Sequence, residues 1–370
     1  MKKLDNQIFQ DRRKSFLSKL DGKAAIIPGA KLVQHHADCE YPFRQESNFW
    51  YLTGFDEPDA IALFLSHKPI GERYILFVHP KDIESEVWNG FRWGTNGAEK
   101  VFKADKSHPI SEFEKELPNY LMGADEIVFS VGKYPEIESI VLNLWAKQID
   151  NYSRIGRAPR AIQPPGIYLN QMRLIKSQYE IERMREAALI SAEAHELVRL
   201  NIGGKNNERQ IQGLLEGFFL EKGTRGPAYN TIAASGDNAC VLHYTANNSE
   251  LKKGDLLLVD AGCSLPDYYN GDITRTFPIG GKFSGEQRAI YEIVLEAQKR
   301  AIQSVITGVS SNDIHNEALK VIIEGLLQIN LLKGGVDEII ENCSYKHFYM
   351  HKTGHWLGLD VHDVGAYRLG

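Results

Sequence analysis

Three of the chain's twelve histidines lie in one short stretch near its C-terminal end, residues 350–364. His351, His355 and His362 stand there among apolar residues and glycines, so their imidazole rings can project from rigid backbone into a cleft. Clustered imidazoles bind divalent metal ions or transfer protons. Two intervening glycines disfavour a long helix, and the stretch is therefore predicted as strand and turn. A histidine that only hydrogen-bonds is the commoner case, so a metal site needs further ligands.

Two carboxylates upstream are candidates for those ligands. The apolar run 256–259 reads as a buried strand that ends in Asp260, and Asp272 opens a second predicted strand, 273–279. Turn-forming residues fill the interval, which predicts a hairpin holding the two carboxylates near each other. Neighbouring carboxylates repel and are costly to bury unless a cation neutralises them. The pair indicates a metal site, with an ordinary solvated surface hairpin as the alternative.

Several motifs of the chain resemble the proline-specific metallopeptidases of the pita-bread fold, the family of the Xaa-Pro aminopeptidases (aminopeptidase P). They are Asp260-Ala-Gly, then Gly271-Asp272-Ile-Thr-Arg-Thr-Phe277, then His351-x-x-x-His355-Trp-Leu-Gly-Leu-Asp-Val-His362-Asp, and near the N-terminus Glu40-Tyr-Pro-Phe-Arg-Gln-Glu-Ser-Asn-Phe-Trp-Tyr-Leu-Thr-Gly-Phe55. The likeness runs through nearly the whole chain. It implies an α/β N-terminal domain followed by an α+β pita-bread catalytic domain.

The resemblance implies a metal-dependent aminopeptidase that releases the N-terminal residue from peptides with proline at the second position. A hydroxide bridging two divalent metal ions would attack the peptide. Asp260, Asp272 and His355 would be metal ligands, with Asp272 shared by both ions. A carboxylate-rich set with one imidazole suits manganese, although zinc or cobalt can occupy the same atoms.

Three histidines would act on the substrate. The resemblance implies that His243 and His362 hydrogen-bond the substrate carbonyl and the tetrahedral intermediate. It also implies that His351 lies at the pocket for the proline side of the substrate. His243 ends a short predicted strand, 241–244, where the ordinary interpretation is a satisfied core histidine. Two other functions stay open. One is a prolidase (Xaa-Pro dipeptidase), and the other is a catalytically inactive pita-bread protein that binds peptide or a partner.

Two features depart from the family pattern. The interval from Asp260 to Asp272 is one residue longer than expected, and the extra residue is harmless in the turn but would form a bulge within a strand. The chain also stops at Gly370, before two glutamate ligands that the resemblance implies, so the catalytic domain is predicted to be C-terminally incomplete. We therefore expect partial metal occupancy and little hydrolysis by these 370 residues alone.

The first 165 residues predict a complete α/β domain, which the resemblance implies is non-catalytic. Apolar spacing indicates an opening amphipathic helix, a set of strands, and a second helix that includes Ile137 and Trp145. The predicted strands are 24–28, 48–52, 60–66, 74–79 and 127–131. Closely spaced prolines from Pro159 to Pro165 interrupt both helix and sheet, and they set the predicted domains at 1–165 and 166–370.

The second domain is predicted to open with two helices. Ser177-Gln-Tyr-Glu180 is a capping box before a helix to about Leu200, and Asn207 begins the next, to about Lys222. The remaining predicted elements are strands 230–235, 241–244, 256–260 and 273–279, then helices 284–305 and 312–329.

Composition excludes several classes of protein. Lys and Arg number 43 against 48 Asp and Glu, a net charge of −5 that offers no electrostatic footprint for nucleic acid. No apolar stretch approaches the roughly 18 residues of a membrane span, and no signal-peptide core precedes the first domain. Four scattered cysteines fit a reducing compartment, so we expect a cytoplasmic protein. The resemblance implies a homo-oligomer, a dimer or tetramer, in which Trp88 could reach an active site across a subunit contact.

Overall fold

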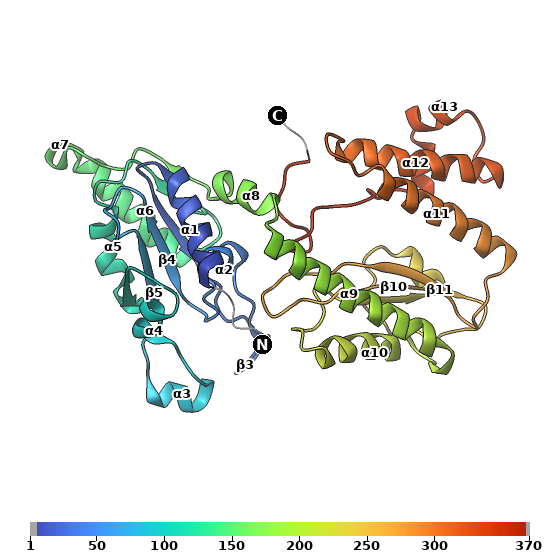
Figure 1. Ribbon diagram of the computed structural model, residues 1–370, viewed down its shortest axis with the longest axis horizontal. Helices are drawn as coiled ribbons and strands as arrows, with labels where there is room; N and C mark the ends of the chain where they lie inside the picture. The colour runs from blue at the N-terminus through green and yellow to red at the C-terminus, as the bar shows by residue number, and fades with distance from the viewer. Residues whose placement is uncertain (1–5, 368–370) are drawn as a thin grey trace. The chain divides into compact units, whose positions relative to one another are not determined.

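The computed structural model describes residues 6–367, which divide into two compact units between Arg173 and Leu174. Both units are drawn in Figure 1. The division falls at the end of helix α8 (Gly166–Leu174) rather than at residue 165. The first unit holds this helix, because Arg173 Nη1 donates to Asn48 Oδ1 at 2.8 Å. Among the described residues, no helix is both long enough and apolar enough to cross a membrane.

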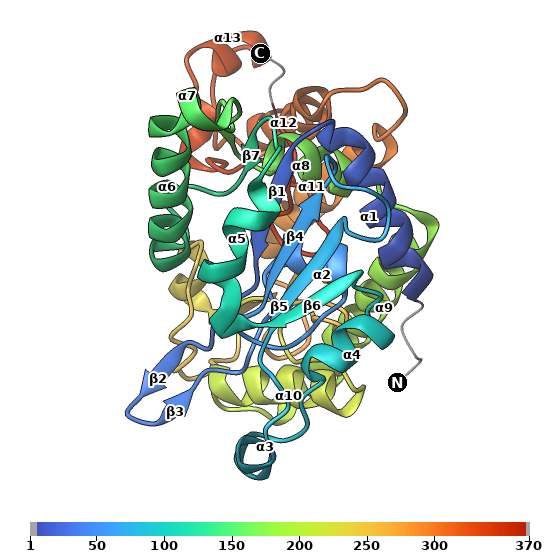
Figure 2. The ribbon, with the colours of Figure 1, turned by 90° about the vertical axis from the view of Figure 1, so that its left-hand side faces the viewer.

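The first unit is built on a six-stranded mixed sheet with the order β6-β5-β4-β1-β7-β8 (Figure 2). Its strands are β1 (Ala24–Pro28), β4 (Ile61–Leu65), β5 (Tyr74–Val78), β6 (Lys106–Pro109), β7 (Ile127–Val128) and β8 (Ile162–Gln163). The three central strands, β1, β4 and β5, pair antiparallel and are buried along their whole length. Strands buried on both faces read as continuous apolar runs, which is why the sequence predicts them.

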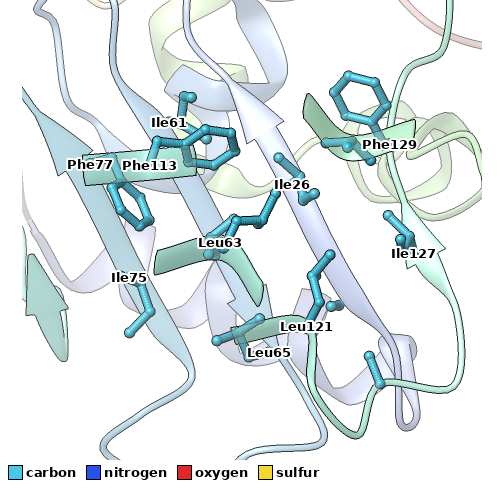
Figure 3. Packing of buried hydrophobic residues seen from close by; sticks show 14 residues of the cluster. Ile26, Ile61, Leu63, Leu65, Ile75, Phe77, Phe113, Leu121, Ile127 and Phe129 are labelled. Atoms are coloured by element: carbon cyan, nitrogen blue, oxygen red, sulfur yellow. The ribbon is translucent and has the colours of Figure 1, made fainter. Parts of the chain in front are cut away.

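Helices cover both faces of this sheet. On one face, α5 (Phe113–Leu121) packs through residues at helical spacing, Phe113, Leu117 and Leu121, and α6 (Pro135–Asp150) adds Val141. Figure 3 shows several of these side chains meeting those of the strands. On the other face lies α1 (Asn6–Leu20), whose Phe16 ring meets the Phe64 ring edge-on at 5.4 Å. The predicted opening helix and second helix are confirmed.

One predicted strand of this unit is wrong. Residues 48–52 lie in a helix, α2 (Ser47–Thr53). The Glu46 carboxylate caps it by accepting from Phe49 N–H, and Gly54 ends it in the left-handed conformation at φ 65°. The run Phe49-Trp-Tyr-Leu52 is buried on every side, so its apolar pattern has no period that separates helix from strand. The unit's remaining elements are the hairpin β2 (Gln34–His36) and β3 (Cys39–Glu40), with helices α3 (Ile83–Asn89), α4 (Gly94–Lys100) and α7 (Tyr152–Ile155).

The second unit contains a three-stranded antiparallel sheet, β11-β10-β9, with helices beside it (Figure 1). The strands are β9 (Ile232–Ser235), β10 (Leu256–Asp260) and β11 (Thr274–Pro278). The helices are α9 (Gln178–Asn201), α10 (Glu208–Glu221), α11 (Gly285–Gln303), α12 (Ser311–Gln328) and α13 (Val336–Glu341). Ser177 and Ser284 begin α9 and α11 with complete capping boxes. The four predicted helices and the predicted hairpin are confirmed.

Two predicted strands of this unit are wrong. The chain forms a short 3₁₀ helix, Gly236–Cys240, and residues 241–244 then run through a turn. Residues 350–364 contain neither helix nor strand, so the expected strand and turn is an irregular segment. Two carbonyls of that segment, those of Gly358 and Leu359, accept hydrogen bonds from the Asn270 side-chain amide, at 3.1 and 2.9 Å, and not from a neighbouring strand.

Candidate metal centre

The hairpin β10–β11 carries the two predicted carboxylates without a bulge. Asp260, the last residue of β10, pairs with Thr274, and the same register continues past the strands to the contact between Leu265 N–H and the Tyr269 carbonyl at 2.9 Å. The turn is closed by Tyr268, which adopts φ 69°. The extra residue in this interval is therefore accommodated in the turn, and the strands keep their alternation.

Asp260 and Asp272 converge on one phenol. Tyr229 Oη lies 2.5 Å from Asp260 Oδ1 and 2.7 Å from Asp272 Oδ1. Burial and the two carboxylates raise the pKa of Tyr229, so the hydroxyl keeps its proton. One hydroxyl hydrogen can satisfy only one of the two oxygens at a time. The other contact then brings lone pairs together, so this group of atoms lacks positive charge.

The environment of Asp260 also favours a cation at this place. Burial raises the pKa of Asp260, and the negative charge of Asp272 adds to the rise, while hydrogen bonds from Tyr229 and Thr274 and the charge of His243 oppose it. A raised carboxyl pKa means that the ionised form is disfavoured where it stands. A cation at this place would remove that cost.

His355 joins the carboxylates through Asp272. Its Nε2 lies 3.0 Å from Asp272 Oδ2, and its Nδ1 lies 2.9 Å from the Trp356 carbonyl oxygen. A carbonyl only accepts, so Nδ1 carries the ring hydrogen and Nε2 of the neutral ring presents a lone pair. That tautomer is the one that binds a metal through Nε2. Nε2 and the Asp272 carboxylate are therefore held together by a proton on Nε2 or by a shared cation.

The structure brings some of the predicted histidines together and not others. The rings of His355 and His362 lie side by side, with centroids 4.2 Å apart. His243 is exposed in the turn after the 3₁₀ helix, near enough for its charge to affect Asp260. His351 is exposed and contacts the carbonyl oxygen of the next residue, Lys352, at 2.9 Å.

Two further side chains hold the histidine segment in place. Asn270, at the end of the hairpin turn, binds two carbonyls of the segment, as described above. Lys176, just before α9, forms an ion pair with Asp363 at 2.8 Å, in which the carboxylate side chain is 1% exposed and the lysine side chain 13%. The predicted ligand His355 and its neighbour His362 lie on the stretch that these two contacts fix.

The donor set fits a divalent metal ion. Asp260, Asp272 and His355 supply carboxylate oxygens and an imidazole nitrogen whose mutual contacts lack positive charge. Within residues 6–367, no three carboxylate, imidazole or thiol groups surround one point as the ligands of a single ion would. The three side chains are linked pairwise instead, Asp260 with Asp272 through Tyr229 and Asp272 with His355 directly.

Comparisons with known proteins agree with this chemistry. Metallopeptidase family M24 matches residues 182–369, a range that includes the predicted ligands Asp260, Asp272 and His355. The N-terminal domain of aminopeptidase P matches residues 9–129 of the first unit. The Xaa-Pro aminopeptidase of Haemophilus influenzae is 41% identical over 99% of this chain and 83% of the relative, and that of Escherichia coli is 38% identical over the same shares.

Solved structures give the same answer. The aminopeptidase PepP of Pseudomonas aeruginosa matches with a TM-score of 0.94 and 39% identity, over 100% of this chain and 84% of that one. A variant of Escherichia coli aminopeptidase P in complex with substrate matches with a TM-score of 0.94 and 38% identity, over 99% and 83%. The same enzyme, zinc-substituted and in complex with product, matches with a TM-score of 0.93. The chain therefore belongs to metallopeptidase family M24, with the pita-bread catalytic domain preceded by the N-terminal domain of the aminopeptidases P.

Proposed function

We propose that this protein is a metal-dependent Xaa-Pro aminopeptidase, which removes the N-terminal residue from peptides with proline at the second position. The observation that carries the proposal is the convergence of Asp260, Asp272 and His355 in contacts that a shared cation would satisfy. Relatives that bear this activity as their name support it, at 38–41% identity over nearly the whole chain.

Asp260, Asp272 and His355 would hold divalent metal, with Asp272 shared between two ions. The carboxylate-rich donor set favours manganese, and zinc or cobalt could occupy the same atoms. Bound divalent ions supply a nucleophile at neutral pH by lowering the pKa of a bound water, and they polarise the scissile carbonyl.

The histidines would supply the remaining interactions with the substrate. His362, packed against His355, and His243, in the turn near Asp260, would donate hydrogen bonds to the substrate carbonyl as negative charge develops on it. His351 would line the pocket for the proline side. A Xaa-Pro bond has no N–H, so a peptidase that requires a backbone donor at that position cannot use it. Histidine donors directed at the carbonyl have no such requirement.

A peptide series tests this function. The protein should cleave Ala-Pro-Ala in the presence of manganese and should leave Ala-Ala-Ala intact, with the free alanine measured by chromatography. Cleavage restricted to Ala-Pro would identify a prolidase. Peptide binding without cleavage would contradict the proposed activity.

We also propose that the protein forms a homo-oligomer through helix α3. This helix buries none of its residues, and its apolar side chains face solvent, with Ile83 81%, Val87 77% and Trp88 86% exposed. An apolar patch of this kind on a soluble domain marks an interaction site, and a second copy of the chain is the proposed partner.

Replacing two of these side chains should dissociate the oligomer. We expect the double variant Val87→Ser with Trp88→Ser to have the mass of a monomer in sedimentation equilibrium, because the buried apolar area is lost. Ile70→Ser is the matched control, since Ile70 is 89% exposed but lies outside α3. An unchanged mass for the α3 variant would exclude this helix as the contact.

A further inference from the structure

Glu208 is a fully buried carboxylate that takes no part in the metal centre. It is the first residue of α10 and has no exposed surface. Glutamate is almost never fully buried unless its charge is compensated. Among the described residues, its partners are neutral hydrogen-bond donors and not an ammonium or guanidinium group.

Both oxygens of Glu208 are saturated by the last residue of β9 and the segment that follows it. Oε1 accepts from Ser235 N–H at 2.7 Å, from Ser235 Oγ at 2.8 Å and from Asn238 Nδ2 at 3.0 Å. Oε2 accepts from Tyr244 Oη at 2.7 Å and from Ser249 N–H at 2.9 Å. Burial by itself raises the pKa of Glu208, but these hydrogen bonds outweigh it and hold the pKa below its usual value. The carboxylate is therefore ionised and acts only as an acceptor.

The segment so held, residues 236–249, carries His243. It forms no strand, so no sheet ladder fixes its path. Its far end is fixed separately by buried Asn247, which accepts from Ala233 N–H at 2.9 Å and donates to the Thr231 carbonyl at 2.7 Å. Tyr244, which follows His243 directly, is held at its hydroxyl by Glu208. Glu208 thus binds the chain before, beside and after the histidine.

We propose that Glu208 is a positioning residue for His243. Its five hydrogen bonds fix the chain on both sides of the histidine and thereby hold the histidine in place. This inference rests on the proposed function, in which His243 donates to the substrate carbonyl. Such a donor is effective only when it is held in place before the reaction, because its orientation then costs nothing at the transition state.

The isosteric amide cannot replace this carboxylate. In Glu208→Gln one terminal atom becomes an NH₂ group, which must face either the N–H of Ser235 or the N–H of Ser249. Both are backbone donors that cannot reverse their role, so one end of the segment is released. Glu221→Gln is the matched control, because Glu221 is the last residue of the same helix and is exposed.

Steady-state kinetics on the active, metal-loaded protein test the proposal. We expect Glu208→Gln to lower kcat about 10-fold with little change in KM, a smaller loss than the roughly 100-fold expected for His243→Ala. Glu221→Gln should match the wild type. In the His243→Ala background, Glu208→Gln should cause no further loss, because a positioning residue has nothing left to position. Hydrogen exchange should be faster for amides 241–249 in Glu208→Gln and unchanged in Glu221→Gln.

Several outcomes would overturn the proposal. One is a kcat for Glu208→Gln equal to that of the wild type. Another is a loss that adds in full to that of His243→Ala, since this indicates a purely structural role. If the wild type cleaves no Xaa-Pro peptide, the proposed function fails on its own account. Hydrogen exchange then decides whether Glu208 holds the segment, and unchanged protection of amides 241–249 would refute that as well.

Discussion

Asp272→Asn should release most of the bound manganese from the folded protein, whereas His351→Ala should retain it. The Asp272 carboxylate contacts Tyr229, which also binds Asp260, at 2.7 Å and His355 at 3.0 Å. A shared ligand touches both proposed ions, and its replacement removes a negative charge as well as a donor atom. Asp272→Asn should therefore lower the affinity for manganese by roughly 100-fold or more. Replacing a residue that only hydrogen-bonds a metal ligand typically lowers the affinity by about 10- to 100-fold.

Asp272→Asn should also stabilise the metal-free protein. The neutral amide of Asp272→Asn would end the repulsion with Asp260, and it could donate to His355 Nε2, which presents a lone pair. We expect the metal-free variant to unfold at a higher temperature than the metal-free wild type. Metal content by elemental analysis, with thermal unfolding followed by circular dichroism, gives both quantities. Equal manganese loss in Asp272→Asn and His351→Ala would remove Asp272 from the ligand set.

Lys176→Met should destabilise the second unit by about 3 kcal/mol or more, because it takes the cation from a buried ion pair. The Asp363 side chain is only 1% exposed, so its charge cannot turn to solvent for compensation. The expected loss includes disorder of the segment with His355 and His362, and metal affinity should fall with stability. Urea unfolding measures the change in free energy.

A second substitution separates lost charge from lost packing. Lys176→Met combined with Asp363→Asn should recover part of the stability, since the buried charge is gone. Arg288→Met is the control, because its ion pair with Glu292 lies at the surface and should contribute nothing measurable. If Lys176→Met proves as mild as Arg288→Met, the pair does not anchor the histidine segment.

Local signals in the sequence predicted much of the fold. The capping boxes at Ser177 and Ser284 involve residues three positions apart, and the structure contains both. The turn-forming residues between the apolar run 256–259 and the strand after Asp272 predicted the hairpin, and the structure contains it as β10 and β11. Both features are set by neighbours along the chain.

The parts that could not be predicted depend on distant residues. Tyr229 contacts carboxylates 31 and 43 positions away, and Glu208 binds donors 27 to 41 positions away. No short sequence motif therefore predicts either set of contacts. The stretches 241–244 and 350–364 have the composition of strands, yet the first forms a turn with a backbone hydrogen bond from Tyr244 N–H to the Val241 carbonyl, and in the second the Asn270 side chain binds the Gly358 carbonyl. Amide and carboxylate partners of this kind leave no periodic pattern.

The contact of Asn270 with the Gly358 carbonyl spans 88 positions of the chain, and that span gives the three proposed ligands unequal costs of assembly. Loop closure costs about 0.6 kcal/mol for each doubling of loop length. The loop that brings His355 to the centre is about three doublings longer than the hairpin joining Asp260 to Asp272. The two carboxylates therefore meet at a conformational-entropy cost about 2 kcal/mol lower than the imidazole does. The histidine has to be held by Asn270 and Lys176, while the aspartates need only their own hairpin.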